Sequence, residues 1–233
     1  MTDIAAGLEH VREVIRQTAA KVGRDPAGIR YILVSKFAAA DKILTAYNAG
    51  ARVFGENRLQ EFVGKKQELP SDIAWHFVGH LQTNKVKQVV GEVALIHSLD
   101  REELAHEIER QAGRKGIAKV PCLVEVNISG EAAKGGFDPD EVKSFIQSID
   151  PDSPIELHGL MTIGPLTENK DEIKLAFRRM KKLFNGLREA VPQAPWDTLS
   201  MGMSGDYSIA IEEGANLLRI GRAVFGAREE MTK

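Results

Sequence analysis

Eight short segments rich in β-forming residues recur along the chain, and most are followed by a segment whose apolar residues have helical spacing. The short segments are too brief for helices and predict strands. The predicted strands cover residues 30–34, 52–54, 74–78, 94–97, 121–126, 155–160, 196–199 and 217–220. The predicted helices between them cover residues 41–48, 57–68, 84–90, 101–111, 141–149, 168–191 and 207–213, and an extra N-terminal helix covers residues 3–21.

Strands separated by helices are expected to pair in parallel through right-handed crossovers. Eight such units in 233 residues predict an α/β protein that forms one closed (β/α)8 TIM barrel, a single domain spanning residues 1–233. The alternative is an open doubly wound sheet, which binds a dinucleotide through a glycine-rich first turn. The corresponding turn here, residues 35–40, reads SKFAAA and contains no glycine, so the pattern favours the barrel.

The charge balance and the single cysteine limit the partners that we expect. Lysine and arginine total 31 and aspartate and glutamate total 33, a formal net charge of −2, which disfavours a broad nucleic-acid surface. The single cysteine, Cys122, cannot form an internal disulfide, which is typical of a reducing compartment. The sequence shows neither a signal peptide nor an apolar run of the roughly 20 residues that a membrane helix needs. We therefore expect a cytoplasmic protein without a membrane or nucleic-acid partner.

Chemistry in a barrel of this kind is expected at the carboxyl ends of the strands. The loop after the seventh predicted strand, Ser200–Asp206, offers two hydroxyl groups and two glycines directly before a helix. The eighth strand ends at Gly221–Arg222, where a glycine lets the backbone approach a ligand. Together the two loops suggest a phosphate site. The alternative is a helix N-cap at Ser204 or Asp206 and a simple turn at Gly221.

Lys36 follows the first predicted strand and is expected at the mouth of the barrel. Partial burial would favour its neutral amine, which can attack a carbonyl group. The alternative is a lysine that extends into solvent. An amine opposite a phosphate site suits an aldehyde that carries a phosphate, either pyridoxal phosphate or a sugar phosphate in a class I aldolase.

Arg219 lies within the last predicted strand and shares a face with Leu217 and Gly221 by alternation. If that face points inward, the arginine would face a cofactor and keep a pyridine nitrogen unprotonated. The alternative is a structural ion pair with an inward carboxylate such as Glu56 or Glu125. His76 could stack on a ring or fill the core, and no pair of histidines has the spacing of a metal site.

Several ordered motifs resemble the YggS/PROSC family of pyridoxal phosphate homeostasis proteins over nearly the whole chain. The motifs that carry the resemblance are residues 33–36 (LVSK), 54–57 (FGEN), 75–85 (WHFVGHLQTNK), 126–129 (VNIS), 158–163 (HGLMTI), 199–204 (LSMGMS) and 219–226 (RIGRAVFG). The resemblance implies a barrel of the alanine racemase N-terminal domain type, fold type III among pyridoxal phosphate proteins, without the second domain of the racemase.

The resemblance also implies where the cofactor, pyridoxal 5'-phosphate, is held. Lys36 would form the internal aldimine, Arg219 would lie near the pyridine nitrogen, and Asn57 would lie on the ring side. Ser200 or Ser204 and the amides of Gly221 and Arg222 would hold the phosphate. Arg222 stands where a small hydroxyl residue is usual, and the loop at residues 134–137 departs from the family pattern, so we expect no ligand role for that loop. The full expected cofactor-binding set is Lys36, Asn57, His76, Ser200, Met201, Ser204, Arg219, Gly221 and Arg222.

The function that the resemblance implies is pyridoxal phosphate (vitamin B6) homeostasis without catalytic turnover. The expected partners are the cofactor and pyridoxal phosphate-dependent apoenzymes, and the expected state is a monomer or weak dimer. The alternative is an amino-acid racemase-like enzyme, which needs a second acid/base residue on the opposite face of the ring. The three tyrosines, Tyr31, Tyr47 and Tyr207, fall away from the predicted strand ends.

Overall fold

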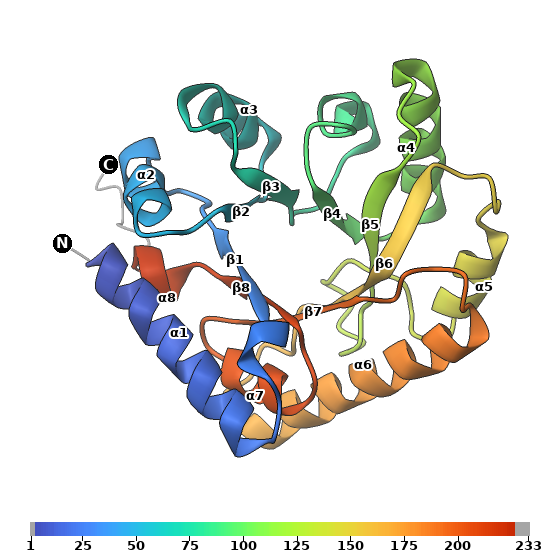
Figure 1. The fold of residues 1–233 in the computed structure, drawn as a ribbon. Coiled ribbons are helices and arrows are strands. Elements are labelled where there is room, and N and C mark those ends of the chain that lie inside the picture. The colour runs from blue at the N-terminus through green and yellow to red at the C-terminus, as the bar shows by residue number, and fades with distance from the viewer. Residues whose placement is uncertain (1–2, 227–233) are drawn as a thin grey trace.

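Eight parallel strands close into a barrel in the computed structural model, which describes residues 3–226 (Figure 1). Closure is complete because the last strand pairs with the first, with Arg30 opposite Leu217 and Leu33 opposite Ile220. The predicted closed barrel is therefore confirmed. The strands are β1 (Arg30–Val34), β2 (Val53–Glu56), β3 (Ala74–Phe77), β4 (Leu95–Leu99), β5 (Val120–Glu125), β6 (Ile155–Met161), β7 (Thr198–Met203) and β8 (Leu217–Ile220).

Helices surround the barrel, and their positions follow the predicted periodicity closely (Figure 1). Three short segments differ: residues 83–88 form a 3-10 helix where a helix at residues 84–90 was predicted, and the short helices at residues 26–28 and 222–225 were not predicted. The tighter 3-10 form is common in helices of only a few residues. The α-helices are α1 (Ile4–Lys21), α2 (Ala40–Asn48), α3 (Leu59–Glu68), α4 (Glu102–Lys115), α5 (Val142–Ser148), α6 (Lys170–Ala190), α7 (Tyr207–Glu212) and α8 (Arg222–Phe225), and the 3-10 helices are η1 (Pro26–Gly28) and η2 (Thr83–Gln88). None of these helices is long and apolar enough to span a bilayer.

β7 begins and ends later than the predicted strand at residues 196–199. Trp196 adopts a positive φ of 46°, which extended backbone does not allow, so the strand begins only at Thr198. The Trp196 indole N–H donates a 2.7 Å hydrogen bond to the carbonyl oxygen of Val191, which closes the turn between α6 and β7. The shift moves Ser200 from the end of the strand to its middle.

Two apolar layers form the core. The larger layer lies between the strands and the helices, and the smaller layer fills the barrel interior with Ile32, Leu95, Leu123, Met161 and Leu217. The alternation along the strands assigns side chains to these layers. Leu217 belongs to the interior layer and Leu218 to the outer one, so the face that Leu217 was predicted to share with Arg219 points inward, which the sequence had left open.

The extra N-terminal helix, α1, packs against α7 and α8 (Figure 1). It approaches α8 closely at Gly7, where a Cβ atom would lie 2.9 Å from the carbonyl oxygen of Ala223. Leu8 and Val11 of α1 are fully buried. α1 therefore supports the short helix that follows β8, at the carboxyl end of the barrel.

Candidate functional site

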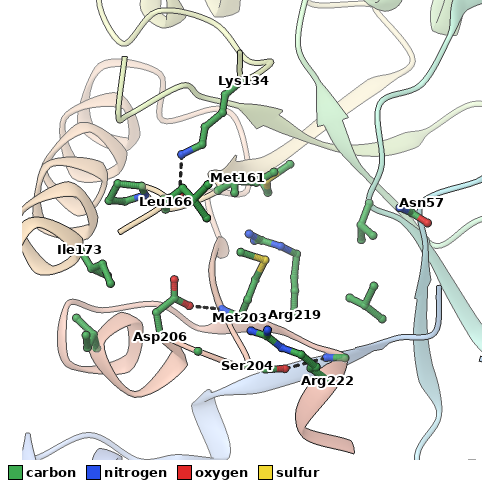
Figure 2. A pocket seen from close by; sticks show the side chains of 18 of the residues that line it. Asn57, Lys134, Met161, Leu166, Ile173, Met203, Ser204, Asp206, Arg219 and Arg222 are labelled. Carbon is green, nitrogen blue, oxygen red and sulfur yellow. Dashed lines mark hydrogen bonds between the residues drawn. The ribbon is translucent and has the colours of Figure 1, made fainter. Parts of the chain in front are cut away.

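A cavity of about 2100 Å³ opens at the carboxyl ends of the strands (Figure 2). Its wall combines groups from β1, β8 and the loops after β2, β5, β6 and β7. Six of the nine predicted site residues line it: Lys36, Asn57, Ser204, Arg219, Gly221 and Arg222. The sequence motifs therefore converge on one space.

Lys36 lies in the turn directly after β1, lines this cavity and is exposed, so its place at the mouth is confirmed but the expected partial burial is not seen. Ser35, before it, is fully buried, whereas Phe37, after it, is exposed and has a positive φ of 63°. The chain thus turns sharply at Lys36, and the lysine follows the strand into the mouth of the barrel.

Arg219 enters the cavity from β8 and is almost fully buried (Figure 2). Its Nη1 donates a 2.8 Å hydrogen bond to Ser200 Oγ, and its Nη2 donates a 2.7 Å hydrogen bond to the carbonyl oxygen of Thr162. Burial lowers the pKa of Arg219 to about 10, against the opposing effect of Asp206 and Glu125. The guanidinium therefore remains charged at neutral pH.

The alternative ion pair of Arg219 with Glu56 or Glu125 does not form among residues 3–226. Glu56 instead accepts from Lys65, with 2.7 Å between Oε1 and Nζ. Glu125 lines the cavity, and burial together with the negative charge of Asp100 raises its pKa to about 7, with Arg219 opposing the shift. A carboxyl group that titrates near neutrality thus shares the cavity with Arg219.

Ser200 and His76 lie below the cavity in a polar chain through the barrel. Ser200 Oγ lies 3.3 Å from His97 Nδ1, and His97 Nε2 lies 3.0 Å from His76 Nδ1. Burial lowers the pKa of His76 to about 4 and the pKa of His97 well below its ordinary value, so both rings are neutral at pH 7. Because Ser200 already accepts from Arg219, its own hydrogen is available to His97. The structure thus places Ser200 under Arg219 and away from the expected phosphate loops.

Met201 is also separated from the cavity. It is fully buried in the layer between the strands and the helices. Successive side chains on a strand point to opposite faces, so Met201 points outward where Ser200 points inward. The structure therefore does not bring Met201, Ser200 or His76 into the lining that holds the other six residues.

The loops after β7 and β8 meet through Ser204 (Figure 2). Ser204 Oγ accepts hydrogen bonds from the backbone amides of Gly221, at 3.3 Å, and Ala223, at 3.1 Å. Within residues 3–226, the amides of Gly205 and Arg222 donate to no protein acceptor. Hydroxyl and free amide donors close together form a suitable site for a small anion.

Sequence reasoning missed three contributions to the cavity. Asp206 accepts from the backbone amide of Met203 and fixes the loop after β7 (Figure 2). Lys134 lines the cavity, although its loop was expected to have no ligand role, and its Nζ donates a 2.8 Å hydrogen bond to the carbonyl oxygen of Gly164. Gly79 allows the loop after β3 to reach Asn57. In the sequence, Asp206 stood out only as a member of the loop at residues 200–206 and an N-cap candidate, Gly79 only as part of the motif at residues 75–85, and Lys134 only by its position after a strand.

Comparisons with known proteins identify the family of this chain. Residues 8–229 match the family "Alanine racemase, N-terminal domain". A "Pyridoxal phosphate homeostasis protein" of Aquifex aeolicus is 41% identical over 227 residues, which cover 95% of this chain and 97% of that protein.

Two solved structures are similar to this chain in fold, and one of them is also similar in sequence. The structure of PipY from Synechococcus elongatus with PLP bound has a TM-score of 0.79 and 33% sequence identity, and the match covers 91% of this chain and 100% of PipY. Alanine racemase from Streptomyces coelicolor shares the fold, with a TM-score of 0.68 at 15% identity over 96% of this chain and 59% of the racemase. The motifs, the closed barrel and these matches together show that the chain belongs to the family of pyridoxal phosphate homeostasis proteins, which is built on the alanine racemase N-terminal domain.

Proposed function

We propose that this chain binds pyridoxal 5'-phosphate through Lys36 and takes part in the homeostasis of that cofactor. The observation that carries the proposal is the convergence of three groups in one cavity: the Lys36 amine, the Arg219 guanidinium and the anion site at Ser204 and Arg222. The relative from Aquifex aeolicus and PipY with PLP bound support it.

The residues present fit this cofactor. When bound, pyridoxal phosphate supplies an aldehyde that reacts with amines and an electron-withdrawing pyridine ring. Lys36 offers the amine for the aldehyde. Ser204 Oγ accepts from two amides and keeps its own hydrogen for a phosphate oxygen, and the free amides of Gly205 and Arg222 add two further donors. Asn57, on the lining beyond β2, would contact the ring side.

Arg219 would determine the protonation of the ring nitrogen. Its two hydrogen bonds to Ser200 and Thr162 hold the guanidinium in place, and it carries a positive charge at neutral pH. A cation next to the pyridine nitrogen disfavours protonation there. This arrangement would weaken the ring as an electron sink, which suits holding the cofactor more than deep carbanion chemistry.

We further propose that the protein holds pyridoxal phosphate without turnover. A racemase needs acid/base groups on both faces of the ring, and none of the three tyrosines lines the cavity. Tyr31 Oη accepts from Arg12, Tyr47 Oη donates to Asp72, and Tyr207 is buried. The names of the full-length relatives favour homeostasis, whereas the alternative, a racemase-like enzyme, rests on the shared barrel.

The same proposal includes a cellular compartment, the cytoplasm, and protein partners. A single buried cysteine, Cys122, is consistent with a reducing cytoplasm. The cavity is open at the end of the barrel, so pyridoxal phosphate-dependent apoenzymes could receive the cofactor there from a monomer or weak dimer.

An absorbance titration tests the proposal. Purified wild-type protein should gain a visible band on addition of pyridoxal phosphate, and the Lys36→Ala variant should not. An absence of this difference would refute binding through Lys36. Turnover of alanine or serine enantiomers by the loaded wild-type protein would instead establish the racemase-like alternative.

A further inference from the structure

A polar cluster outside the cavity holds the turn that carries Lys36. We define this cluster as Ser35, Glu56, Glu61 and Lys65. Ser35 and Glu56 are fully buried at the ends of β1 and β2, and Glu61 and Lys65 lie one turn apart on α3. None of the four lines the cavity. The cluster therefore contacts the turn on the side away from the cavity.

The cluster forms hydrogen bonds with the backbone on both sides of Lys36. Glu61 Oε2 accepts a 2.9 Å hydrogen bond from the amide of Phe37, the residue after Lys36. Lys65 Nζ donates a 2.8 Å hydrogen bond to the carbonyl oxygen of Ser35, the residue before it. Glu61 and Lys65 are themselves joined, with 2.9 Å between Oε2 and Nζ. One ion pair on α3 thus fixes the peptide groups that flank Lys36.

Glu56 anchors the pair to the barrel. Its Oε1 accepts from Lys65 Nζ at 2.7 Å and from Ser35 Oγ at 2.6 Å. Lys65 is mostly buried and has carboxylates on two sides, so its charge is compensated where it touches the turn. The charged Lys65 amine therefore links the turn at Ser35 to the carboxylates of Glu56 and Glu61.

The turn needs such support because of the backbone of Phe37. Its φ of 63° lies in the left-handed region, which is unfavourable for a residue with a side chain. Such conformations persist where the surrounding structure enforces them, and they occur frequently at functional sites. The Arg58 guanidinium also lies 4.9 Å from the centre of the Phe37 ring. Residues of α3 and of the segment before it thus hold the strained residue next to Lys36.

We propose that Glu61 and Lys65 are positioning residues that aim the Lys36 amine into the cavity. The inference rests on the proposed function, because it deepens the role of Lys36 in cofactor binding. It assigns no contact between these two residues and the cofactor. Their removal should weaken the covalent part of binding and leave the anion site after β7 and β8 intact.

A double-mutant cycle tests this role. The Lys65→Met and Glu61→Ala changes are made in the wild type and in a Lys36→Ala background, and pyridoxal phosphate binding is measured by fluorescence titration. We expect a loss of about tenfold in the presence of Lys36 and less than about twofold in its absence, since misplacement affects only the group that is misplaced. Glu61→Gln, which keeps an acceptor for the Phe37 amide, should restore most of the affinity.

The control is the neighbouring lysine on the same helix. Lys66 Nζ pairs with Glu92 at 2.6 Å on the surface, away from the turn. Lys66→Met should change binding by less than about twofold in either background. Equal losses for Lys65→Met and Glu61→Ala in both backgrounds would show a general structural effect and overturn the proposal. Unchanged binding in the wild-type background would overturn it as well.

A second readout needs no cofactor. The cofactor-free protein is treated with limiting acetic anhydride, and peptide mass spectrometry compares acetylation of Lys36 with that of Lys174, a partly exposed lysine on α6 that lies within 4 Å of Glu212 and Glu213. Glu61→Ala should change this ratio about threefold or more, and Lys66→Met should not, because only the first releases the turn. Unchanged Lys36 reactivity in Glu61→Ala would refute positioning. If wild-type protein fails to bind pyridoxal phosphate, the proposed function fails, but this ratio still decides the role of Glu61.

Discussion

The Gly79→Ala substitution should displace Asn57 from the cavity wall. A Cβ atom on Gly79 would lie 2.4 Å from the carbonyl oxygen of Asn57 and 2.7 Å from its Cα atom. Ordinary contacts of a Cβ atom begin near 3.4 Å, so the overlap is about 1 Å. The atoms that it meets are backbone atoms, which cannot rotate away. The loops after β2 and β3 would therefore have to move apart.

The cost of this movement can be estimated and compared with a matched control. Forcing a group into a packed site costs about 1–3 kcal/mol. Gly64 lies within α3, and a Cβ atom there would meet nothing within 4 Å. Gly64→Ala should therefore stabilise the protein by about 1 kcal/mol through the higher helix propensity of alanine. The free energies of unfolding of the two variants should then differ by about 2–4 kcal/mol.

Thermal unfolding and cofactor titration together measure the effect. For a chain of this size, 1 kcal/mol corresponds to about 2–4 °C, so the Tm values of the two variants should differ by about 4–16 °C. Gly79→Ala should also weaken pyridoxal phosphate binding, whereas Gly64→Ala should bind as the wild type does. Equal Tm values, or wild-type binding by a destabilised Gly79→Ala variant, would refute the close approach as the reason for the glycine.

Three further predictions concern the loops and the buried groups. Ser204→Ala should lower the free energy of unfolding by about 1 kcal/mol in urea titrations and weaken cofactor binding about tenfold, because two amides lose their acceptor; Ser204→Thr should restore both. Burial raises the pKa of Glu125 from 4.5 to about 7, so the folded state binds the proton of this carboxyl group more tightly than the unfolded chain does. The free energy of unfolding should therefore fall by up to about 3 kcal/mol as the pH rises from about 4.5 to about 7. Glu125→Gln should remove this decline, and parallel pH profiles of the two proteins would contradict it. Burial raises the pKa of Cys122, so a thiol reagent should modify it only after unfolding, and rapid modification of the native protein would contradict its burial.

The barrel and the shared face of Leu217, Arg219 and Gly221 could be predicted because periodicity determines both, whereas the inward direction of that face could not. Leu217, Arg219 and Gly221 follow one another at the spacing of two that places side chains on one face of a strand. Leu217 indeed lies in the interior layer, and Arg219 and Gly221 line the cavity above it. Such predictions need only local sequence and the rule that functional groups gather at the carboxyl ends of the strands.

The depth of Ser200 could not be predicted, because it depends on where β7 begins. The positive φ of Trp196 delays the strand, and the register places Ser200 opposite Leu217 and Met203 opposite Arg219. Ser200 therefore lies one level below the cavity wall and binds the arginine. The contacts of Lys65 with the turn at Ser35 are equally invisible in the sequence, since they join residues 30 positions apart.

The most direct test of the central claim is to locate the covalent bond. Wild-type protein is mixed with pyridoxal phosphate, reduced with borohydride, digested and mapped by mass spectrometry. We expect one added cofactor per chain on the peptide that contains Lys36, and loss of this modification with the Lys36→Ala variant. Modification confined to other lysines, or none at all, would contradict the assignment of Lys36 as the group that holds the cofactor.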